Sequence, residues 1–137
     1  MSEASRKVHY HVAAGMIWKD GRVLITRRPK GSHMEGLWEF PGGKKEEGET
    51  LRECLEREIR EELGVDVRAE EFLARVDHEY ETRSISLHLF RCSPPEQVPV
   101  PLGCESILWV RPEELGQHSM PAADQRLLDW IADHPLS

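Results

Sequence analysis

The sequence lacks long hydrophobic runs. No stretch approaches the roughly 18 apolar residues that a membrane-spanning helix requires. The first residues, MSEASRKVHYHV, contain no apolar core of the kind found in secretory signals. We therefore expect a cytoplasmic protein that has no membrane partner.

Cysteine is scarce as well. The three cysteines, Cys54, Cys92 and Cys104, are widely spaced and form no C-x-x-C pair. Their odd number and wide spacing argue against a disulfide framework and against a zinc site built from thiolates. A reducing compartment fits this pattern, in agreement with the expected cytoplasmic location.

Positive charge is in deficit. Lysine and arginine together number 18 against 25 aspartates and glutamates, which gives a formal net charge of -7. A chain with this balance repels the phosphate backbone of DNA or RNA, so we expect no polynucleotide partner. A small nucleotide remains compatible, because a bound divalent cation reverses the sign of the charge at a local site.

The pattern of apolar residues predicts strands in both halves of the chain. Asp20-Gly21 between the apolar runs 8–18 and 23–26 is typical of a β-hairpin. A short strand over 37–40 is expected to end at Pro41-Gly42-Gly43. Further strands are predicted over 71–80, 84–92 and 106–110.

Two helices are predicted. Thr50 and Glu53 form a capping-box pattern, and Gly64 supplies a C-terminal cap for a helix over 51–63. Apolar side chains recur at helical spacing over 121–134, whereas 112–115 is expected to be a turn or one helical turn. Several strands with two helices and no internal repeat predict a single mixed α/β domain over residues 1–137, with a core of about 8–133.

The helix over 51–63 carries carboxylates outside its solvated face. At about 100° per residue, Glu58 and Glu62 fall within the arc of Leu51 and Leu55, and Glu61 lies at its margin. Ionised groups there are costly unless they are paired or bound to a metal. Arginines one turn away would pair with them, and three carboxylates near one point would equally suit Mg²⁺ or Mn²⁺. The candidate arginines are Arg52, Arg57 and Arg60.

This segment resembles the signature of the Nudix hydrolase superfamily, G-x5-E-x7-R-E-U-x-E-E-x-G-U, in which U is bulky and apolar. The match begins at Gly43 and ends at Val65, without a mismatch at any specified position. The stretch before it, VLITRRPKGSHMEGLWEFPGGK, is similar to the MutT and CTP pyrophosphohydrolase branch. A thinner likeness covers most of residues 8–131.

The resemblance implies an α/β/α sandwich in which a mixed β-sheet lies between helices. It also implies hydrolysis of a nucleoside diphosphate linked to another group. In the MutT-like branch this reaction would convert a nucleoside triphosphate, (d)CTP-like or carrying an oxidised purine, to monophosphate and pyrophosphate.

The resemblance further implies a Mg²⁺ cofactor, with Mn²⁺ as a possible replacement. The implied metal ligands are the carbonyl of Gly43 and the carboxylates of Glu58, Glu61, Glu62 and Glu105. Arg57 would orient the carboxylates, and Glu49 would support the loop before the helix. Glu58 and Glu105 are the two candidates to accept the proton of the attacking water, although Glu105 also suits a solvated loop.

Substrate contacts are implied for Arg28, His33, Glu39, Phe40, Arg83 and Asp124. Asp124 aligns with the position where MutT-like enzymes place Asn or Asp against the base edge, and an Asp there is closer to the cytidine triphosphate branch. It also suits the first turn of a helix on electrostatic grounds alone. Phe40 fits a core position as well as a stacking platform, and Arg83 is expected in the turn between two strands.

Two other functions remain open at this level. One is hydrolysis of a different diphosphate derivative such as ADP-ribose, and the other is nucleotide binding without hydrolysis, because a fold does not fix a function. The intact acidic set favours an enzyme over a binding module. The sequence decides neither the base, the sugar nor the number of metal ions. We expect a monomer, with a dimer as the alternative.

Overall fold

The computed structural model describes residues 7–134 and contains one seven-stranded mixed sheet. Its central order is β3-β2-β1-β6-β5, with β4 paired to β1 and β7 paired to β2. The pairing of β1 with β6 is parallel, and the other described pairings are antiparallel. The strands are β1 (Val8–Lys19), β2 (Arg22–Arg27), β3 (Trp38–Glu39), β4 (Gly42–Lys44), β5 (Ala69–Glu79), β6 (Arg83–Cys92) and β7 (Ser106–Val110).

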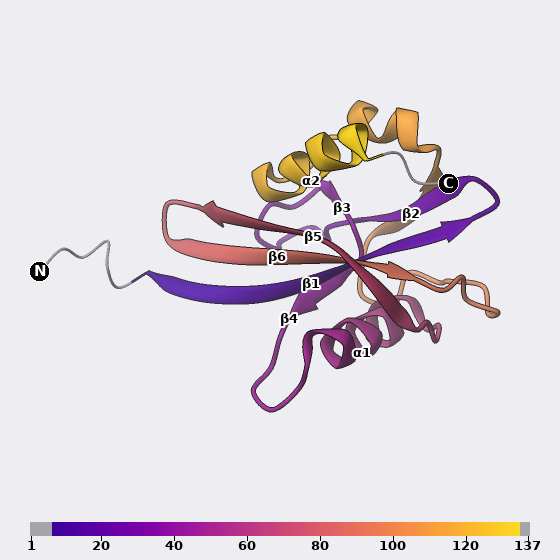
Figure 1. The fold of residues 1–137 in the computed structure, drawn as a ribbon, viewed down its shortest axis with the longest axis horizontal. Coiled ribbons are helices and arrows are strands. Elements are labelled where there is room, and N and C mark those ends of the chain that lie inside the picture. The colour runs from indigo at the N-terminus through magenta and orange to yellow at the C-terminus, as the bar shows by residue number, and fades with distance from the viewer. Residues whose placement is uncertain (1–6, 135–137) are drawn as a thin grey trace, which may run out of the picture.

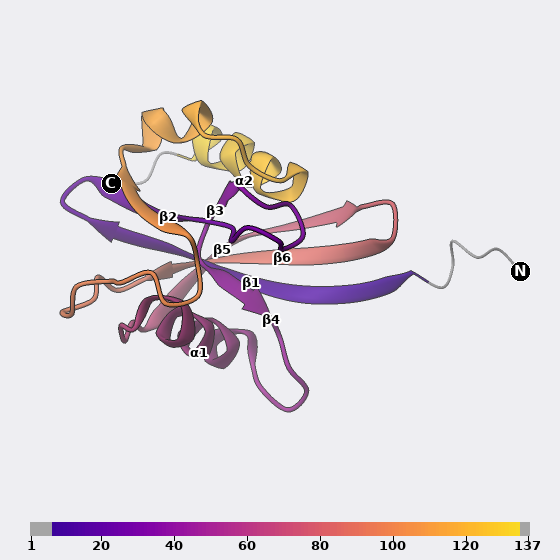
Figure 2. The same ribbon diagram turned by 180° about the vertical axis from the view of Figure 1, so that it is seen from behind.

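Helices cover both faces of this sheet. Helix α1 (Leu51–Leu63) lies on one face, and helix α2 (Ala122–Asp133) lies on the other with the short 3-10 helix η2 (Pro112–Gln117) (Figures 1 and 2). The α/β/α sandwich with a mixed sheet is therefore confirmed. Within residues 7–134, no helix combines the length and apolar character needed to cross a bilayer.

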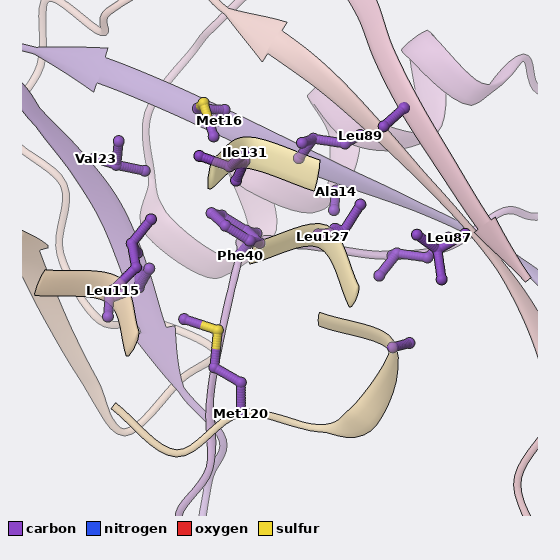
Figure 3. Packing of buried hydrophobic residues seen from close by; sticks show 14 of the residues in the cluster. Ala14, Met16, Val23, Phe40, Leu87, Leu89, Leu115, Met120, Leu127 and Ile131 are labelled. Carbon is purple, nitrogen blue, oxygen red and sulfur yellow. The ribbon is translucent and has the colours of Figure 1, made fainter. Parts of the chain in front are cut away.

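A separate hydrophobic core fills the space on each side of the sheet. On the α2 side, Phe40 packs with Leu127, Ile131 and Met120 from the C-terminal part of the chain (Figure 3). The core on the α1 side contains Cys54, Leu55, Ile59 and Leu63 of the helix, together with strand residues such as Ile17, Leu24 and Phe90. Full burial of one such aliphatic or aromatic side chain contributes roughly 1.5 to 3 kcal/mol, so both layers are anchored independently.

Local sequence explains the ends of α1. The Glu53 N–H donates to Thr50 Oγ1 at 3.1 Å, and the Thr50 N–H donates to Glu53 Oε1 at 2.8 Å, which closes the capping box. Gly64 takes a left-handed φ of 67° and donates its N–H to the Arg60 carbonyl. The predicted helix over 51–63 is confirmed at both ends.

The segment after β3 corrects the sequence prediction. Pro41-Gly42-Gly43 was expected to end a strand and begin a loop, but residues 42–44 form β4 and pair with β1. Gly42 makes this possible, because an added Cβ would lie 1.9 Å from the Ala13 carbonyl oxygen. Its φ of +154° also disfavours residues with a side chain. Arg83 differs in a similar way: it is the first residue of β6, opposite Val8, instead of part of the turn.

Candidate active site

Arg57 is the centre of an ion-pair network on α1. Its guanidinium donates to both oxygens of Glu49, at 2.8 and 3.0 Å. Its Nη1 atom also lies 3.0 Å from Glu58 Oε1 and 3.3 Å from Glu61 Oε2. The hydrogen bond to Arg57 lowers the pKa of Glu49 to about 2. One arginine therefore joins the loop before the helix to two of the implied metal ligands.

Glu62 lies apart from this arginine. It accepts a hydrogen bond from the Gly42 N–H at 3.2 Å, and no ion pair reaches it within residues 7–134. The pKa of Glu62 is raised to about 8, first by burial and then by the nearby charges of Glu39 and Glu58, while the hydrogen bond from the Gly42 N–H acts in the opposite direction. A buried carboxylate without a cation is costly in its ionised form, so this position is suited to a positive ligand.

Gly43 has no room for a side chain. A Cβ at this position would lie 2.2 Å from Glu58 Oε2, so β4 and α1 are in direct contact here. The Gly43 carbonyl accepts a hydrogen bond from the thiol of Cys54 at 3.5 Å. Burial raises the pKa of Cys54 to about 12, which keeps the thiol protonated and able to donate.

The carboxylates of α1 fit a divalent cation by chemistry. They are hard oxygen donors, and hard oxygen donors are what Mg²⁺ and Mn²⁺ prefer. Burial raises the pKa of Glu58 as well, against the stabilising effect of Arg57. Among the described residues no three ligating side chains already converge on one point, because Glu58 and Glu61 are turned toward Arg57. Glu62 has no paired cation among the described residues, and a cation bound beside it would favour its ionised form.

Arginine side chains thus pair with only some of the carboxylates on α1. Arg57 pairs with Glu58 and Glu61, whereas Arg52 donates to the Glu70 carbonyl and Arg60 pairs with Asp66. The remaining acids have structural partners: Glu53 closes the cap, and Glu56 accepts from the Ala69 N–H at 2.9 Å. Pairing within the helix therefore leaves Glu62 without a cation.

Glu105 lies outside this cluster. It precedes β7, as expected, and its backbone N–H donates to the Arg27 carbonyl at 2.9 Å. Its side chain is exposed, and in the part of the chain that the structure describes no hydrogen bond or ion pair joins it to the acids of α1. Leu102 and Gly103, just before it, both donate their N–H groups to the Glu62 carbonyl, so the loop that carries Glu105 lies against the C-terminal end of α1.

A cavity of about 220 Å³ lies beside β4, on the opposite side of the sheet from α1. All six implied substrate contacts line it, and Gly42 and Gly43 form part of its wall. Further lining residues were missed by sequence reasoning, because they come from separated strands and loops. The missed residues are Val12, Ala13, Ala14, Met34, Lys44, Tyr80, Ile85, Leu87 and Pro121. Lys44 and Tyr80 could have been considered from the sequence, because Lys44 follows Gly43 and Tyr80 lies three residues before Arg83.

Arg28 and Glu39 form an ion pair in the cavity wall. Arg28 Nη1 lies 3.1 Å from Glu39 Oε2, and Arg28 Nε donates to the His33 carbonyl at 2.5 Å. Burial raises the pKa of Glu39, and Arg28 counteracts this shift. Burial also lowers the pKa of His33, as do the positive charges of Arg83 and Arg28. Neighbouring Arg27 instead donates to the Gly36 carbonyl, so Arg28 is the one that faces the cavity.

Phe40 and Asp124 meet at the buried end of the cavity. The Phe40 N–H points to Asp124 Oδ2 at 3.4 Å, and both side chains are nearly fully buried. The pKa of Asp124 is raised to about 8, mainly by burial and also by the charge of Glu39. Phe40 is a core residue and a cavity wall at once. Glu39 and Phe40 are adjacent in the sequence and both line the cavity, and β3 ends at Glu39.

The α/β/α fold, with an acidic helix and a cavity of about 220 Å³ that meet at β4, is that of a hydrolase of the α/β/α type. A family model described as NUDIX domain matches residues 13–130. The chain belongs to this family and is a Nudix hydrolase.

Relatives with curated names support the same placement. The chain is 37% identical over 118 residues to the CTP pyrophosphohydrolase of Escherichia coli K12, a match that covers 86% of this chain and 87% of the relative. It is 47% identical over 85 residues to the 8-oxo-dGTP diphosphatase of Proteus vulgaris, covering 61% and 76% of the two chains.

Solved structures share the whole architecture. The solution structure of the E. coli ORF135 protein has a TM-score of 0.82 at 34% identity and covers 97% of this chain and 98% of its own. The crystal structure of MutT protein from Methanosarcina mazei Go1 has a TM-score of 0.83 at 24% identity, with 95% and 98% covered, which is a likeness of fold.

Proposed function

We propose that the protein is a Mg²⁺-dependent nucleoside triphosphate pyrophosphohydrolase that releases pyrophosphate from (d)CTP-like or oxidised purine nucleoside triphosphates. The observation that carries this proposal is that the cavity and the acidic helix meet at β4. The Gly42 N–H donates to the Glu62 carboxylate, and Gly43 lies against the Glu58 side chain. Both glycines also line the cavity. A nucleotide whose base occupies the cavity would therefore have its phosphates beside the acidic helix.

The names of the relatives support a triphosphate substrate. One relative is named for CTP and another for 8-oxo-dGTP. In each of these names the reaction is hydrolysis of a nucleoside triphosphate. The proposed reaction adds water to phosphorus and breaks one phosphoanhydride bond, so that the products are a nucleoside monophosphate and pyrophosphate.

The acidic residues would hold the cation, and Arg57 would hold the acidic residues. Glu58, Glu61 and Glu62 are the proposed ligands, with the Gly43 carbonyl. When bound, Mg²⁺ supplies neutralisation of the phosphate oxygens and orientation of the attacking water. Arg57 keeps Glu58 and Glu61 on the same side of α1, and the Gly42 N–H fixes Glu62.

Glu58 is the better placed of the two candidate bases. Arg57 engages its Oε1 atom, which leaves Oε2 toward Gly43 and able to accept a proton. The Glu105 side chain is exposed, and it is not among the ion-pair partners of Arg57 in the described residues. The proposal therefore assigns proton transfer to Glu58 Oε2 and keeps Glu105 as the second candidate.

Asp124 would choose the base. With a pKa of about 8, its buried carboxyl group is mainly neutral at pH 7, so it offers one O–H donor and one carbonyl acceptor. Cytosine presents the complementary pair on its pairing edge, an acceptor ring nitrogen beside an amino donor. Guanine presents two donors there, which an ionised carboxylate fits better. The neutral form of Asp124 therefore favours cytosine.

The test is release of pyrophosphate and monophosphate from CTP, dCTP, 5-methyl-dCTP, dGTP and 8-oxo-dGTP with Mg²⁺ or with EDTA. We expect Mg²⁺-dependent turnover with a preference among the bases. Glu61→Gln should abolish most of it, whereas Glu96→Gln, at an exposed loop position outside the network, should not.

Absence of turnover for all five triphosphates would overturn the proposed substrate class. The next substrates would then be capped diphosphates such as ADP-ribose. If neither class is hydrolysed but nucleotides bind, the protein is a binding module and the proposed reaction is wrong.

A further inference from the structure

Helix α2 begins without a cap of its own. Its N-cap residue is Pro121, whose side chain makes no capping hydrogen bond. The first N–H groups of a helix have no partner within the helix and need one from elsewhere. Here the Ala123 N–H donates to the phenolic oxygen of Tyr80 at 3.1 Å. A residue at the end of the β5 hairpin therefore caps the C-terminal helix.

This cap lies at the base end of the cavity. The residue after Ala123 is Asp124, which is buried in the cavity wall, and Tyr80 lines the same cavity. Arg83 is close by, with its guanidinium 6.0 Å from the centre of the Tyr80 ring. The Tyr80 carbonyl is held as well, because it accepts from Lys7 Nζ at 2.7 Å. Arg83 therefore contacts the Tyr80 ring, and Lys7 contacts the Tyr80 backbone.

The hydroxyl group of Tyr80 keeps its proton available. A phenol has one O–H donor besides its acceptor sites, and the hydrogen bond from Ala123 uses only an acceptor site. Within residues 7–134 the Tyr80 hydroxyl donates to no hydrogen-bond partner. Burial raises the pKa of Tyr80, so the group remains a donor at neutral pH.

We propose that Tyr80 determines specificity for the nucleoside: its hydroxyl group, held by the Ala123 N–H, donates a hydrogen bond to an acceptor on the base. This inference rests on the proposed function for the location of the base. It adds a donor to the cavity beside Asp124, whose helix the same hydroxyl group caps. A base bound there is then read at two points, by the Asp124 carboxyl group and by the Tyr80 hydroxyl group.

The experiment compares binding of a nucleotide with binding of the same sugar phosphate without a base. Dissociation constants for dCMP, dGMP and 2-deoxyribose 5-phosphate are measured by calorimetry for wild type, Tyr80→Phe and Tyr10→Phe. Tyr80→Phe keeps the ring and removes only the hydroxyl group. Tyr10→Phe makes the same change at the other tyrosine, which does not line the cavity.

We expect Tyr80→Phe to weaken binding of the preferred monophosphate roughly 3- to 10-fold, the range of one neutral hydrogen bond. Binding of 2-deoxyribose 5-phosphate should be unchanged, and Tyr10→Phe should behave as wild type. Equal weakening of nucleotide and sugar phosphate would overturn the inference, and so would a loss that disappears when Tyr80→Phe is made in an Asp124→Asn background, because the hydroxyl group would then act only by positioning Asp124. No weakening, or no preference of the wild type for nucleotide over sugar phosphate, would overturn it too.

These outcomes are separate from the hydrolysis test. The proposed function fails if triphosphates bind but are not cleaved, and that result leaves the monophosphate comparison intact. A cleaving wild type with an unaffected Tyr80→Phe variant would remove the inference and keep the proposed function.

Discussion

Replacement of Asp124 by Asn should make the protein's stability less dependent on pH. Asp124 has an ordinary pKa of 3.8 when unfolded and a pKa of about 8 in the folded protein, because burial penalises its charge. The unfolded chain therefore releases this proton long before the folded protein does. A raised carboxyl pKa adds stability that is complete below the unfolded value and is lost as the pH rises toward the folded value.

The size of the effect follows from the shift. One unit of pKa is worth about 1.4 kcal/mol, so this group removes roughly 2 to 3 kcal/mol of unfolding free energy between pH 5 and pH 7. Asn carries no charge at either pH, so the Asp124→Asn variant does not lose this contribution. Between pH 5 and pH 7 the unfolding free energy of the wild type should therefore fall by roughly 2 to 3 kcal/mol more than that of the variant.

The assay is urea unfolding at pH 5, 6 and 7 with EDTA present, followed by tryptophan fluorescence. Asp129→Asn is the matched control, because Asp129 lies on the same helix but is exposed. The control should keep the wild-type slope. If Asp124→Asn also keeps it, the Asp124 carboxyl group is ionised in the folded protein and the argument from burial is wrong.

Three further changes test other parts of the structure. Gly43→Ala places a Cβ 2.2 Å from Glu58 Oε2, so we expect kcat for the preferred triphosphate to fall about 100-fold. Gly116→Ala is the control, because there is open space around Gly116. Equal kcat values for the two variants would contradict the role of the Gly43 contact. Thr50→Ala removes the cap of α1 and should lower the unfolding free energy by about 1 kcal/mol in urea, whereas an unchanged midpoint would refute the cap. Raising the pH from 7 to 9 ionises Asp124, so the kcat/KM ratio of dCTP to dGTP should fall several-fold in wild type but not in Asp124→Asn; parallel profiles would refute this role.

The limits of α1 could be predicted because the residues that determine them are close to the helix in sequence. The capping box at Thr50 and the glycine at 64 act within one turn of the helix, so the limits of α1 were predictable. The spacing of Arg57 from Glu58 and Glu61 likewise placed them within reach on one helix. Their ion pairs are present in the structure.

Features that depend on distant segments were not predictable in the same way. Strand β4 exists because Gly42 fits against Ala13 of β1, and no local pattern shows that approach. Glu105 was selected only by its approximate place in the loop before a strand, and the sequence does not show that this loop contacts the end of α1 through Leu102 and Gly103. The contact of the Tyr80 hydroxyl group with the start of α2 joins residues 43 positions apart, so no local pattern shows it.

In the proposed function, nucleotide recognition and hydrolysis take place on opposite sides of the sheet. The cavity for the base is built from the α2 side, and the acidic residues come from the α1 side, each with its own hydrophobic core. The segment 42–44 belongs to both, and the cavity residue Glu39 acts on Glu62 through its charge. Substitutions at cavity positions other than these would therefore change the preferred nucleotide with little effect on the acidic helix, so a protein of this design can acquire new substrates in evolution while it conserves its chemistry.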